Sequence, residues 1–519
     1  MLDYLRRLAT TGIAYTGASI VSKLFSVALL PVYTTLIDPI EYGKAEVLFA
    51  GVVAASIVVR FGLIEALLRF YYLPSERGEE VVRTGFAGLF WAVTAFSVVL
   101  VPLAGPLADL LETDPSLVRI AVGGLWLLTL YEYLLTLLRI DERAKAYFVF
   151  TFTHVLVAIP LTLVLILGAD MQSSALLLGS YASGIPFVLY LVVTERRRLG
   201  LVPDRPLTRR MLRFGLPTMP AELSLYSLNF ADRLLFVLLL GAASGNAAAG
   251  VYAVAFKFSQ AVQIIARGFQ LAWPPLAYSI LDDEEARRTY AVVVSAFTAL
   301  CTVVVVAVWL ESRWIVDLLA ADRFADAYKA VGLLVAGSAL NGIYMALLVV
   351  LGRTGRTEFN FPATLAALAV NVGLNIWLIP KEGIVGAGIA LLAAYATAVG
   401  LMYVFTQRLF YVPYEWGRLA AILLLTIGTI AAGELLLPTE GIEGFLLRGA
   451  LIAAFPLLLW LLAMSGEERA ATRAYANRDA IAAKLTELRR RRAQAEAEGD
   501  RPDEALEAET LDRDVRDQF

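Results

Sequence analysis

Apolar runs of 18 or more residues recur along the first 465 positions of this 519-residue chain. An α-helix rises about 1.5 Å per residue, so roughly 20 apolar residues cross the hydrocarbon core of a bilayer, which is about 30 Å thick. Only 18% of the residues are charged and 59% are hydrophobic, whereas about a quarter of the residues in a soluble domain are charged. The sequence therefore predicts an all-α protein that crosses a membrane many times.

We predict about fourteen transmembrane helices in the apolar part of the chain. Their expected ranges are 10–36, 45–69, 83–109, 118–139, 146–168, 173–194, 212–240, 248–275, 290–320, 327–351, 359–379, 384–408, 417–437 and 444–464. The stretch LNIWLIPKEGIVGAGIALLAAY, residues 374–395, contains the end of one span and the start of the next. Its segment Pro380–Gly383 interrupts the apolar sequence and predicts a short turn between two helices.

Arginine and lysine are distributed unevenly between the connections. Basic residues occur in alternate loops, for example at Arg6–Arg7, Arg196–Arg198 and Arg353, whereas 169–172 and 241–247 contain none. Cytoplasmic loops carry the excess of basic residues in membrane proteins. Both termini are therefore predicted to lie in the cytoplasm, in a multi-pass protein of the plasma membrane. No cleavable signal peptide is expected, because the first apolar run is too long.

The longest internal interruption of the apolar runs, ERRRLGLVPDRPLTRRMLR at 195–213, follows six predicted spans and contains seven arginines. It indicates two six-helix lobes. The expected divisions are an N-terminal lobe at 1–194, a basic cytoplasmic linker at 195–211, a C-terminal lobe at 212–408, two additional transmembrane helices at 409–465 and a charged cytoplasmic tail at 466–519. The composition of the tail predicts a solvated helix followed by disorder.

A weak internal repeat relates the two lobes. RFGLIEALLRFYY begins at Arg60 in the second span, and RGFQLAWPPLAYS begins at Arg267 in the eighth. Aligning these two segments also matches Gly43 to Gly250. Six spans per lobe is an even number, so both lobes begin on the same side of the membrane. This predicts a parallel pseudo-repeat about an axis normal to the membrane, which is one of the known transporter plans.

Polar side chains recur at helical spacing in the first two predicted helices of each lobe. A charge at the middle of a membrane helix costs roughly 2.5–3.5 kcal/mol and usually faces a wet interior. We predict that these helices line a central cavity whose deep charges are largely cationic and suit an anionic cargo such as phosphate or a uronic acid. The candidate substrate-binding residues are Lys23, Arg60, Glu222, Asn229, Arg233, Lys257 and Arg267. Alternatively, the cations pair with Glu222, Asp232, Glu65 or backbone carbonyls and only hold helices together.

Other functional groups are sparse. Glu132 and His154 are lone ionisable residues inside predicted spans, suited either to a coupling proton or to a structural hydrogen bond. The single cysteine, Cys301, excludes an intrachain disulfide, and a single histidine argues against a histidine-based metal site or triad. No nucleotide-binding, zinc-binding or nucleophile motif is present. We therefore expect no catalytic residue, cofactor or metal, and no nucleic-acid partner.

Four segments together resemble the polysaccharide transporter family, the Wzx-like flippases of the multidrug/oligosaccharidyl-lipid/polysaccharide exporter superfamily. They are SKLFSVALLPVYTTLIDPIEYGKAEV from Ser22, FGLPTMPAELSLYSLNFADRLLFVLLLG from Phe214, AAGVYAVAFKFSQAVQII from Ala248, and the stretch from Leu374 to Tyr395. The resemblance covers most of residues 10–465. It implies a V-shaped pair of six-helix lobes with two further spans, and the charged tail is not part of the family pattern.

The resemblance also implies a function. Members of the family move polyprenyl-pyrophosphate-linked sugars from the inner to the outer leaflet by alternating access, for surface polysaccharide or glycan biosynthesis. The expected partners are the lipid-linked oligosaccharide, membrane lipid and polysaccharide-assembly proteins. A peptidoglycan-precursor flippase and a drug/cation antiporter of the same superfamily remain alternatives. A membrane glycosyltransferase is disfavoured, because no large outer loop is available to hold catalytic carboxylates.

Overall fold

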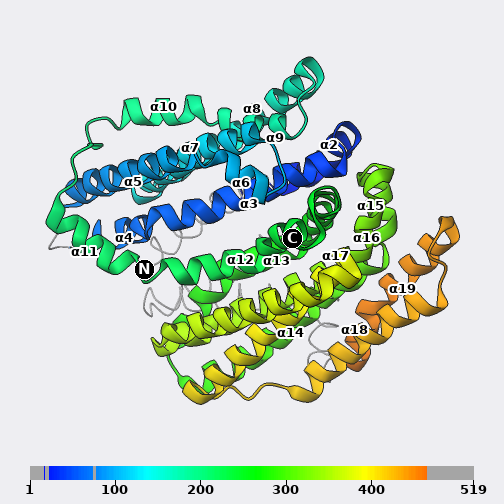
Figure 1. Ribbon diagram of the computed structural model, residues 1–519. Helices are drawn as coiled ribbons and strands as arrows, with labels where there is room; N and C mark the ends of the chain where they lie inside the picture. Colours follow the sequence, from blue (N-terminus) through cyan, green and yellow to red (C-terminus); the bar gives the residue numbers. More distant parts are fainter. Residues whose placement is uncertain (1–16, 18–22, 74–76, 464–519) are drawn as a thin grey trace, which may run out of the picture.

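The computed structural model describes residues 17, 23–73 and 77–463, and the regular secondary structure in them is helical (Figure 1). The N-terminal bundle contains α2 (Leu30–Leu36), α3 (Pro39–Arg60), α4 (Leu63–Phe70), α5 (Gly78–Leu100), α6 (Ala104–Leu110), α7 (Pro115–Ile140), α8 (Ala144–Ala169), α9 (Ser173–Ala182) and α10 (Ile185–Thr194). Helix α11 (Arg205–Gly215) follows. The C-terminal bundle contains α12 (Met219–Leu240), α13 (Ala242–Ser279), α14 (Asp283–Leu310), α15 (Ser312–Leu319), the 3-10 helix η1 (Asp322–Ala327), α16 (Tyr328–Thr354), the 3-10 helix η2 (Thr357–Phe359) and α17 (Asn360–Leu409).

A C-terminal hairpin, α18 (Trp416–Leu436) and α19 (Gly441–Leu462), packs against α14. Figure 1 shows the blue and cyan N-terminal bundle beside the green and yellow C-terminal bundle, with the orange hairpin at the outer edge of the latter. The two bundles meet mainly through α3, which contacts both α12 and α13.

Twelve helices in the described part of the chain are long and apolar enough to cross a membrane. One of them, α17, has 50 residues and a length of about 75 Å, more than twice the thickness of the hydrocarbon core. Its backbone leaves the helical region at Gly383, where φ is 55° and ψ is −128°. The turn predicted at Pro380–Gly383 is therefore confirmed, and α17 supplies two spans.

The predicted all-α polytopic membrane fold is thus confirmed. The span expected at 10–36 is described only in part, as a helical segment from Lys23 to Ala28 followed by α2. The tail predicted at 466–519 lies outside the described residues.

The span expected at 45–69 is broken into two helices. Phe61 and Gly62 adopt left-handed conformations, with φ of 47° and 67°, and so end α3 and start α4. Gly62 is needed for packing as well as for its backbone conformation, because a Cβ atom there would lie 2.1 Å from the carbonyl oxygen of Gly215. The break therefore brings the end of α3 against the chain segment that leads into α12.

The last part of the predicted linker at 195–211 is helical and belongs to α11. The Asp204 side chain accepts a hydrogen bond from the Leu207 amide at 2.7 Å and caps α11. Pro206 occupies the first turn, where its missing N–H costs no helical hydrogen bond. The division between two lobes at this linker stays a prediction.

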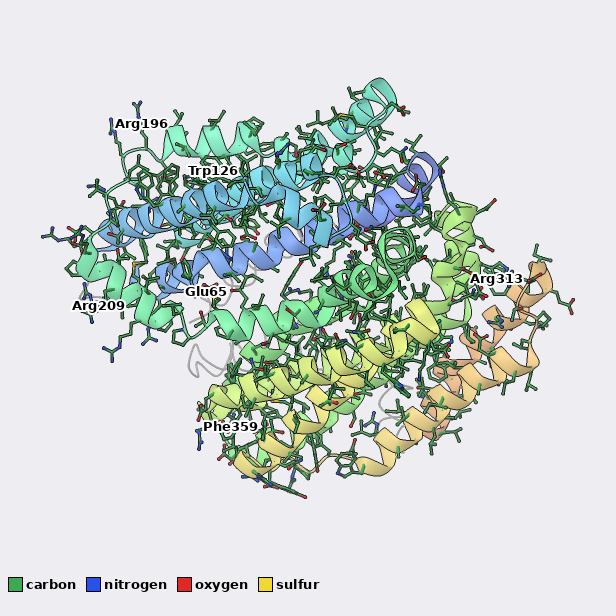
Figure 2. All side chains as sticks on the ribbon, in the orientation of Figure 1. Glu65, Trp126, Arg196, Arg209, Arg313 and Phe359 are labelled. Carbon is green, nitrogen blue, oxygen red and sulfur yellow. The ribbon has the colours of Figure 1, made fainter. Side chains whose placement is uncertain are left out.

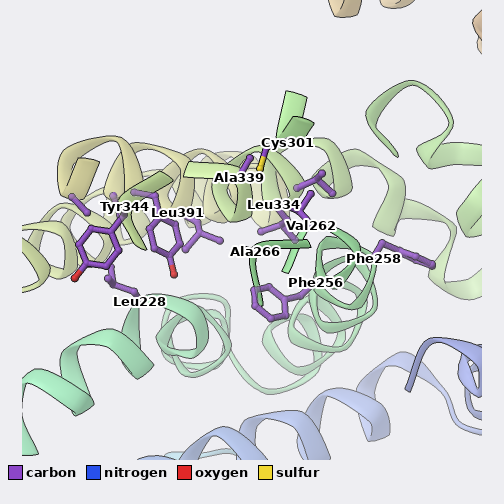
Figure 3. Packing of buried hydrophobic residues seen from close by; sticks show 14 of the residues in the cluster. Leu228, Phe256, Phe258, Val262, Ala266, Cys301, Leu334, Ala339, Tyr344 and Leu391 are labelled. Carbon is purple, nitrogen blue, oxygen red and sulfur yellow. The ribbon is translucent and has the colours of Figure 1, made fainter. Parts of the chain in front are cut away.

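Buried hydrophobic residues form separate cores in the two bundles. One core consists of residues within 48–211, and a larger core is built mainly from residues within 228–414, with the start of α3 included. Figure 3 shows Leu228, Tyr344 and Leu391 of three helices projecting into the larger core. Lipid chains are as apolar as leucine, so such cores stabilise a membrane protein through close packing more than through exclusion of water.

Glycines bring α3 and α13 into backbone contact where the bundles meet. A Cβ atom on Gly43 would lie 1.8 Å from the carbonyl oxygen of Asn246, and one on Gly250 would lie 2.2 Å from the carbonyl oxygen of Pro39. Gly43 and Gly250 are the residues that the predicted repeat aligns. This contact lies where the two bundles meet, and the repeat that relates the bundles stays a prediction.

Candidate functional site

Arg60, the last residue of α3, joins the two bundles through two carboxylates. Its Nη1 lies 3.1 Å from Glu132 Oε2 on α7, and its Nη2 lies 2.8 Å from Glu222 Oε1 on α12. Arg60 is buried, whereas the Glu132 and Glu222 side chains are 34% and 38% exposed. The arginine is therefore a bridge between acids of opposite bundles, and those acids border an open space.

A second ionic cluster lies nearer the start of α3. Glu46 Oε2 lies 3.6 Å from Arg233 Nε on α12, and Glu46 Oε1 lies 3.4 Å from Lys257 Nζ on α13. Lys257 also donates a hydrogen bond to the hydroxyl of Tyr42. Arg233 is only 2% exposed, and its guanidinium lies 4.7 Å from the centre of the Phe230 ring, within the range of a cation–π contact. Glu46 of the N-terminal bundle thus contacts two cations of the C-terminal bundle and offsets one of their two positive charges.

Lys23 and Arg267 are arranged differently. Lys23 Nζ donates to Gln263 Oε1 of α13 at 2.9 Å, and Arg267 Nη1 donates to Gln270 Oε1 at 3.2 Å. Arg267 is exposed and lies four residues after Gln263, on the same face of α13. Within the described parts of the chain, neither cation forms an ion pair with a carboxylate. The two positive charges therefore face the same region without neutralisation.

A polar cluster inside the C-terminal bundle was not anticipated from the sequence. Asp232 on α12 is fully buried and accepts hydrogen bonds from the Tyr252 hydroxyl at 2.7 Å and from Asn375 Nδ2 at 2.6 Å. Asn375 Nδ2 also donates to Asn371 Oδ1 at 3.1 Å. Two asparagines four residues apart in an apolar span are the sequence signal that could have identified this cluster. It links α12 to α13 and α17.

The structure thus divides the seven predicted binding residues into paired and unpaired groups. Arg60 and Glu222 pair with each other, while Arg233 and Lys257 share Glu46 rather than the acids named beforehand. Asn229 accepts a hydrogen bond from the Tyr395 hydroxyl at 2.9 Å. Glu132, treated beforehand as a lone group, joins the Arg60 bridge, and Glu46 and Tyr42 were missing from the predicted set. Among the described residues, Lys23 and Arg267 are the two predicted binding cations that form no ion pair with a carboxylate.

A protein-family model described as a polysaccharide biosynthesis protein matches residues 32–329, more than half of the chain. The chain belongs to this family. The match includes the helices of both bundles that carry the two ionic clusters, and it confirms the resemblance found in the sequence. None of the curated proteins compared with the chain matches it significantly.

Solved structures show the fold that this polysaccharide biosynthesis protein shares with transporters. The lipid II flippase MurJ in an inward closed conformation superposes with a TM-score of 0.68 at 12% identity, over 87% of this chain and 98% of that one. An inward-facing MATE multidrug resistance transporter of the MOP superfamily gives 0.60 at 15% identity, over 75% and 95% of the two chains. An outward-facing MATE transporter gives 0.56 at 15% identity, over 78% and 94%. The fold is therefore of the MOP type.

Proposed function

We propose that this polysaccharide biosynthesis protein is a flippase that moves a polyprenyl-pyrophosphate-linked oligosaccharide from the inner to the outer leaflet by alternating access. The family and the MOP-type fold support a membrane transporter. The observation that carries the cargo assignment is that Lys23, which contacts Gln263 of α13, and Arg267, four residues after Gln263 on the same helix, form no ion pair with a carboxylate among the described residues. Transport needs no catalytic group, so the proposed role is not enzymatic.

The charge pair fits the pyrophosphate of such a cargo. Two like charges repel each other, and the repulsion strengthens as water is excluded. A pyrophosphate between Lys23 and Arg267 would relieve that repulsion. Arginine would bind two phosphate oxygens through its planar fork, while lysine would act as a point charge. The polyprenyl chain would remain in lipid and pass between the bundles while the sugar occupies the wet space.

The two interbundle ionic clusters have a separate role in this proposal. Alternating access requires contacts between the bundles that form in one state and break in the other. The Arg60 bridge and the Glu46 cluster both cross between the bundles and lie toward opposite ends of α3. They are the proposed ionic contacts that open and close in turn.

A peptidoglycan-precursor flippase is the second candidate, favoured by the structural likeness to the lipid II flippase MurJ. It would use the same cationic pair, because a lipid pyrophosphate is again the charged group. A drug/cation antiporter is disfavoured, since Lys23 and Arg267 would repel a cationic cargo.

Replacing Lys23 or Arg267 with glutamine is expected to leave the amount of folded protein unchanged and to reduce export at least tenfold. Glutamine keeps hydrogen-bonding capacity but removes the charge that holds the pyrophosphate. Arg267→Lys should retain more activity than Arg267→Gln, because it keeps the charge. The measurement is glycan export in cells that lack the transporter, normalised to the protein in the membrane. Wild-type export by both glutamine variants would refute the charge-pair assignment.

Reconstitution tests the cargo class directly. Vesicles containing the purified protein should expose a fluorescent polyprenyl-pyrophosphate-linked oligosaccharide to the opposite leaflet faster than protein-free vesicles, and they should not accumulate a cationic dye. Accumulation of the dye without movement of the lipid-linked sugar would favour the antiporter instead.

The proposed orientation in the plasma membrane places both termini and the segment after α10 in the cytoplasm. A topology reporter fused after Gly168 or after Gly241 is expected to lie on the extracytoplasmic side of the membrane. A reporter fused after Arg198 or at the C-terminus is expected to lie in the cytoplasm. The alternation of basic loops gives this expectation. A clear reversal at any of these four positions would contradict the topology.

A further inference from the structure

An apolar groove of about 600 Å³ opens on the side of the N-terminal bundle, between α5, α7 and α10. Its walls include Phe90, Trp126 and Leu189, and its end is formed by Leu199–Leu201 of the segment that follows α10. This volume is within the range of pockets that hold drug-sized ligands, about 300–1,000 Å³. The groove lies outside the interface between the bundles, so its occupant is separate from the transported cargo.

The groove is built by specific contacts rather than by loose packing. Trp91 Nε1 donates to the carbonyl oxygen of Leu201 at 2.7 Å, which fastens the end of the groove to α5. Trp126 Nε1 donates to Thr94 Oγ1 at 3.0 Å, so its polar group is satisfied and its ring is left to line the wall. The Arg83 side chain packs directly against the backbone of Gly200. A Cβ atom at position 200 would lie 2.5 Å from Arg83 Cγ, so a larger residue there would displace the arginine.

Exposed arginines stand at one end of the groove. Arg196 lines it directly, and Arg83 Nη2 donates to the carbonyl oxygen of Arg197 beside it at 3.4 Å. The side chains of all three arginines are exposed. Figure 2 places Arg196 just beyond the end of α10 and Trp126 on α7, farther into the bundle. The groove is therefore cationic at its mouth and apolar along its length.

Nearby acids do not neutralise this mouth. Glu195 pairs with Arg143 at 2.9 Å and with Arg198 at 3.3 Å. Glu79 pairs with Arg198 at 3.0 Å. Among the described residues, Arg83, Arg196 and Arg197 form no ion pair. The acids are thus occupied by other arginines, and the positive charge at the mouth is available to an external anion.

The depth of the groove matches one leaflet. From Ile185 to Val192 it follows α10 for about 10 Å, and the segment beyond α10 extends it toward the membrane surface. Half of the hydrocarbon core is about 15 Å thick. The predicted orientation places the arginines at the cytoplasmic surface, where anionic lipids attract basic side chains.

We propose that this groove binds an anionic phospholipid of the cytoplasmic leaflet, with an acyl chain along α10 and the phosphate at Arg196 and Arg197. The charge at the mouth selects an anionic headgroup, and the apolar walls hold the chain. The bound lipid fills the side of the bundle and steadies α10 against α5 and α7.

Native mass spectrometry of the full-length protein tests the site with phosphatidylglycerol and phosphatidylcholine of identical chains. Wild-type protein is expected to retain phosphatidylglycerol at least fivefold more than phosphatidylcholine. The double variant Arg196→Gln/Arg197→Gln should lower phosphatidylglycerol retention to the phosphatidylcholine level. Leu189→Trp, which fills the groove, should reduce retention of both lipids.

Arg209→Gln is the matched control, because Arg209 is an exposed arginine of α11 that does not line the groove. It should retain lipid as the wild type does, and the melting temperature without added lipid should show that each variant is folded. Equal retention of the two lipids by the wild type would overturn the proposal. Unchanged selectivity in the Arg196/Arg197 variant would also overturn it.

Discussion

Replacing Gly43 with alanine is expected to reduce export at least tenfold. The added methyl would lie 1.8 Å from the carbonyl oxygen of Asn246 and 2.9 Å from the amide nitrogen of Gly250. Both are backbone atoms, so no side-chain rotation relieves the clash, and α3 must move away from α13. Overpacking in a close contact typically costs about 1–3 kcal/mol. This cost destabilises the conformation in which α3 packs against α13. The equilibrium between the two transport states therefore shifts toward the other state.

Gly51→Ala is the control on the same helix, because nothing lies within 4 Å of a Cβ atom placed there. It should leave export and melting temperature near the wild-type values. Gly250→Ala should reproduce the Gly43 defect, since its methyl would lie 2.2 Å from the carbonyl oxygen of Pro39. Export is measured per amount of membrane protein, together with the melting temperature in detergent. Normal export and stability of Gly43→Ala would show that the helices can separate without consequence.

Replacing Arg60 with glutamine is expected to lower the amount of folded protein, in contrast to the same change at Arg267. Loss of the guanidinium leaves Glu132 and Glu222 without their shared counter-charge. Removing one partner of a fully buried ion pair typically costs about 3–5 kcal/mol, and the cost here is smaller because the Glu132 and Glu222 side chains are 34% and 38% exposed. Arg267 is exposed and pairs with no carboxylate among the described residues, so its loss should affect export rather than folding.

A second substitution tests whether the loss of stability in Arg60→Gln comes from the broken ion pairs with Glu132 and Glu222. Glu222→Gln on the Arg60→Gln background should restore part of the lost melting temperature, because it removes one of the two uncompensated acids. The measurements are the melting temperature in detergent and the monodisperse yield of the single and double variants. A fully stable Arg60→Gln protein, with no recovery in the double variant, would show that the bridge contributes little to the fold.

The sequence alone determined the membrane architecture. Apolar run length is set by bilayer thickness, and Gly383 marked the turn that divides α17, so the fold class and this turn followed from local properties of the chain. Helical periodicity also predicted that Arg60 faces other helices, because a charge inside a membrane rarely faces lipid, and Arg60 contacts Glu132 and Glu222. The break between α3 and α4 after Arg60 could not be predicted from the sequence. It depends on the left-handed backbone conformations of Phe61 and Gly62, which pack against Gly215.

Only the tertiary structure decided which charges pair. Asp232 and Arg233 are neighbours in sequence, but successive residues on a helix point about 100° apart. Asp232 therefore faces Asn375 on α17, while Arg233 faces Glu46 on α3. Helical periodicity specifies the face of one helix but not the register and crossing of its partner, and each ion pair depends on both. Packing therefore paired Arg60 with two acids and left Arg267, its counterpart in the predicted repeat, exposed.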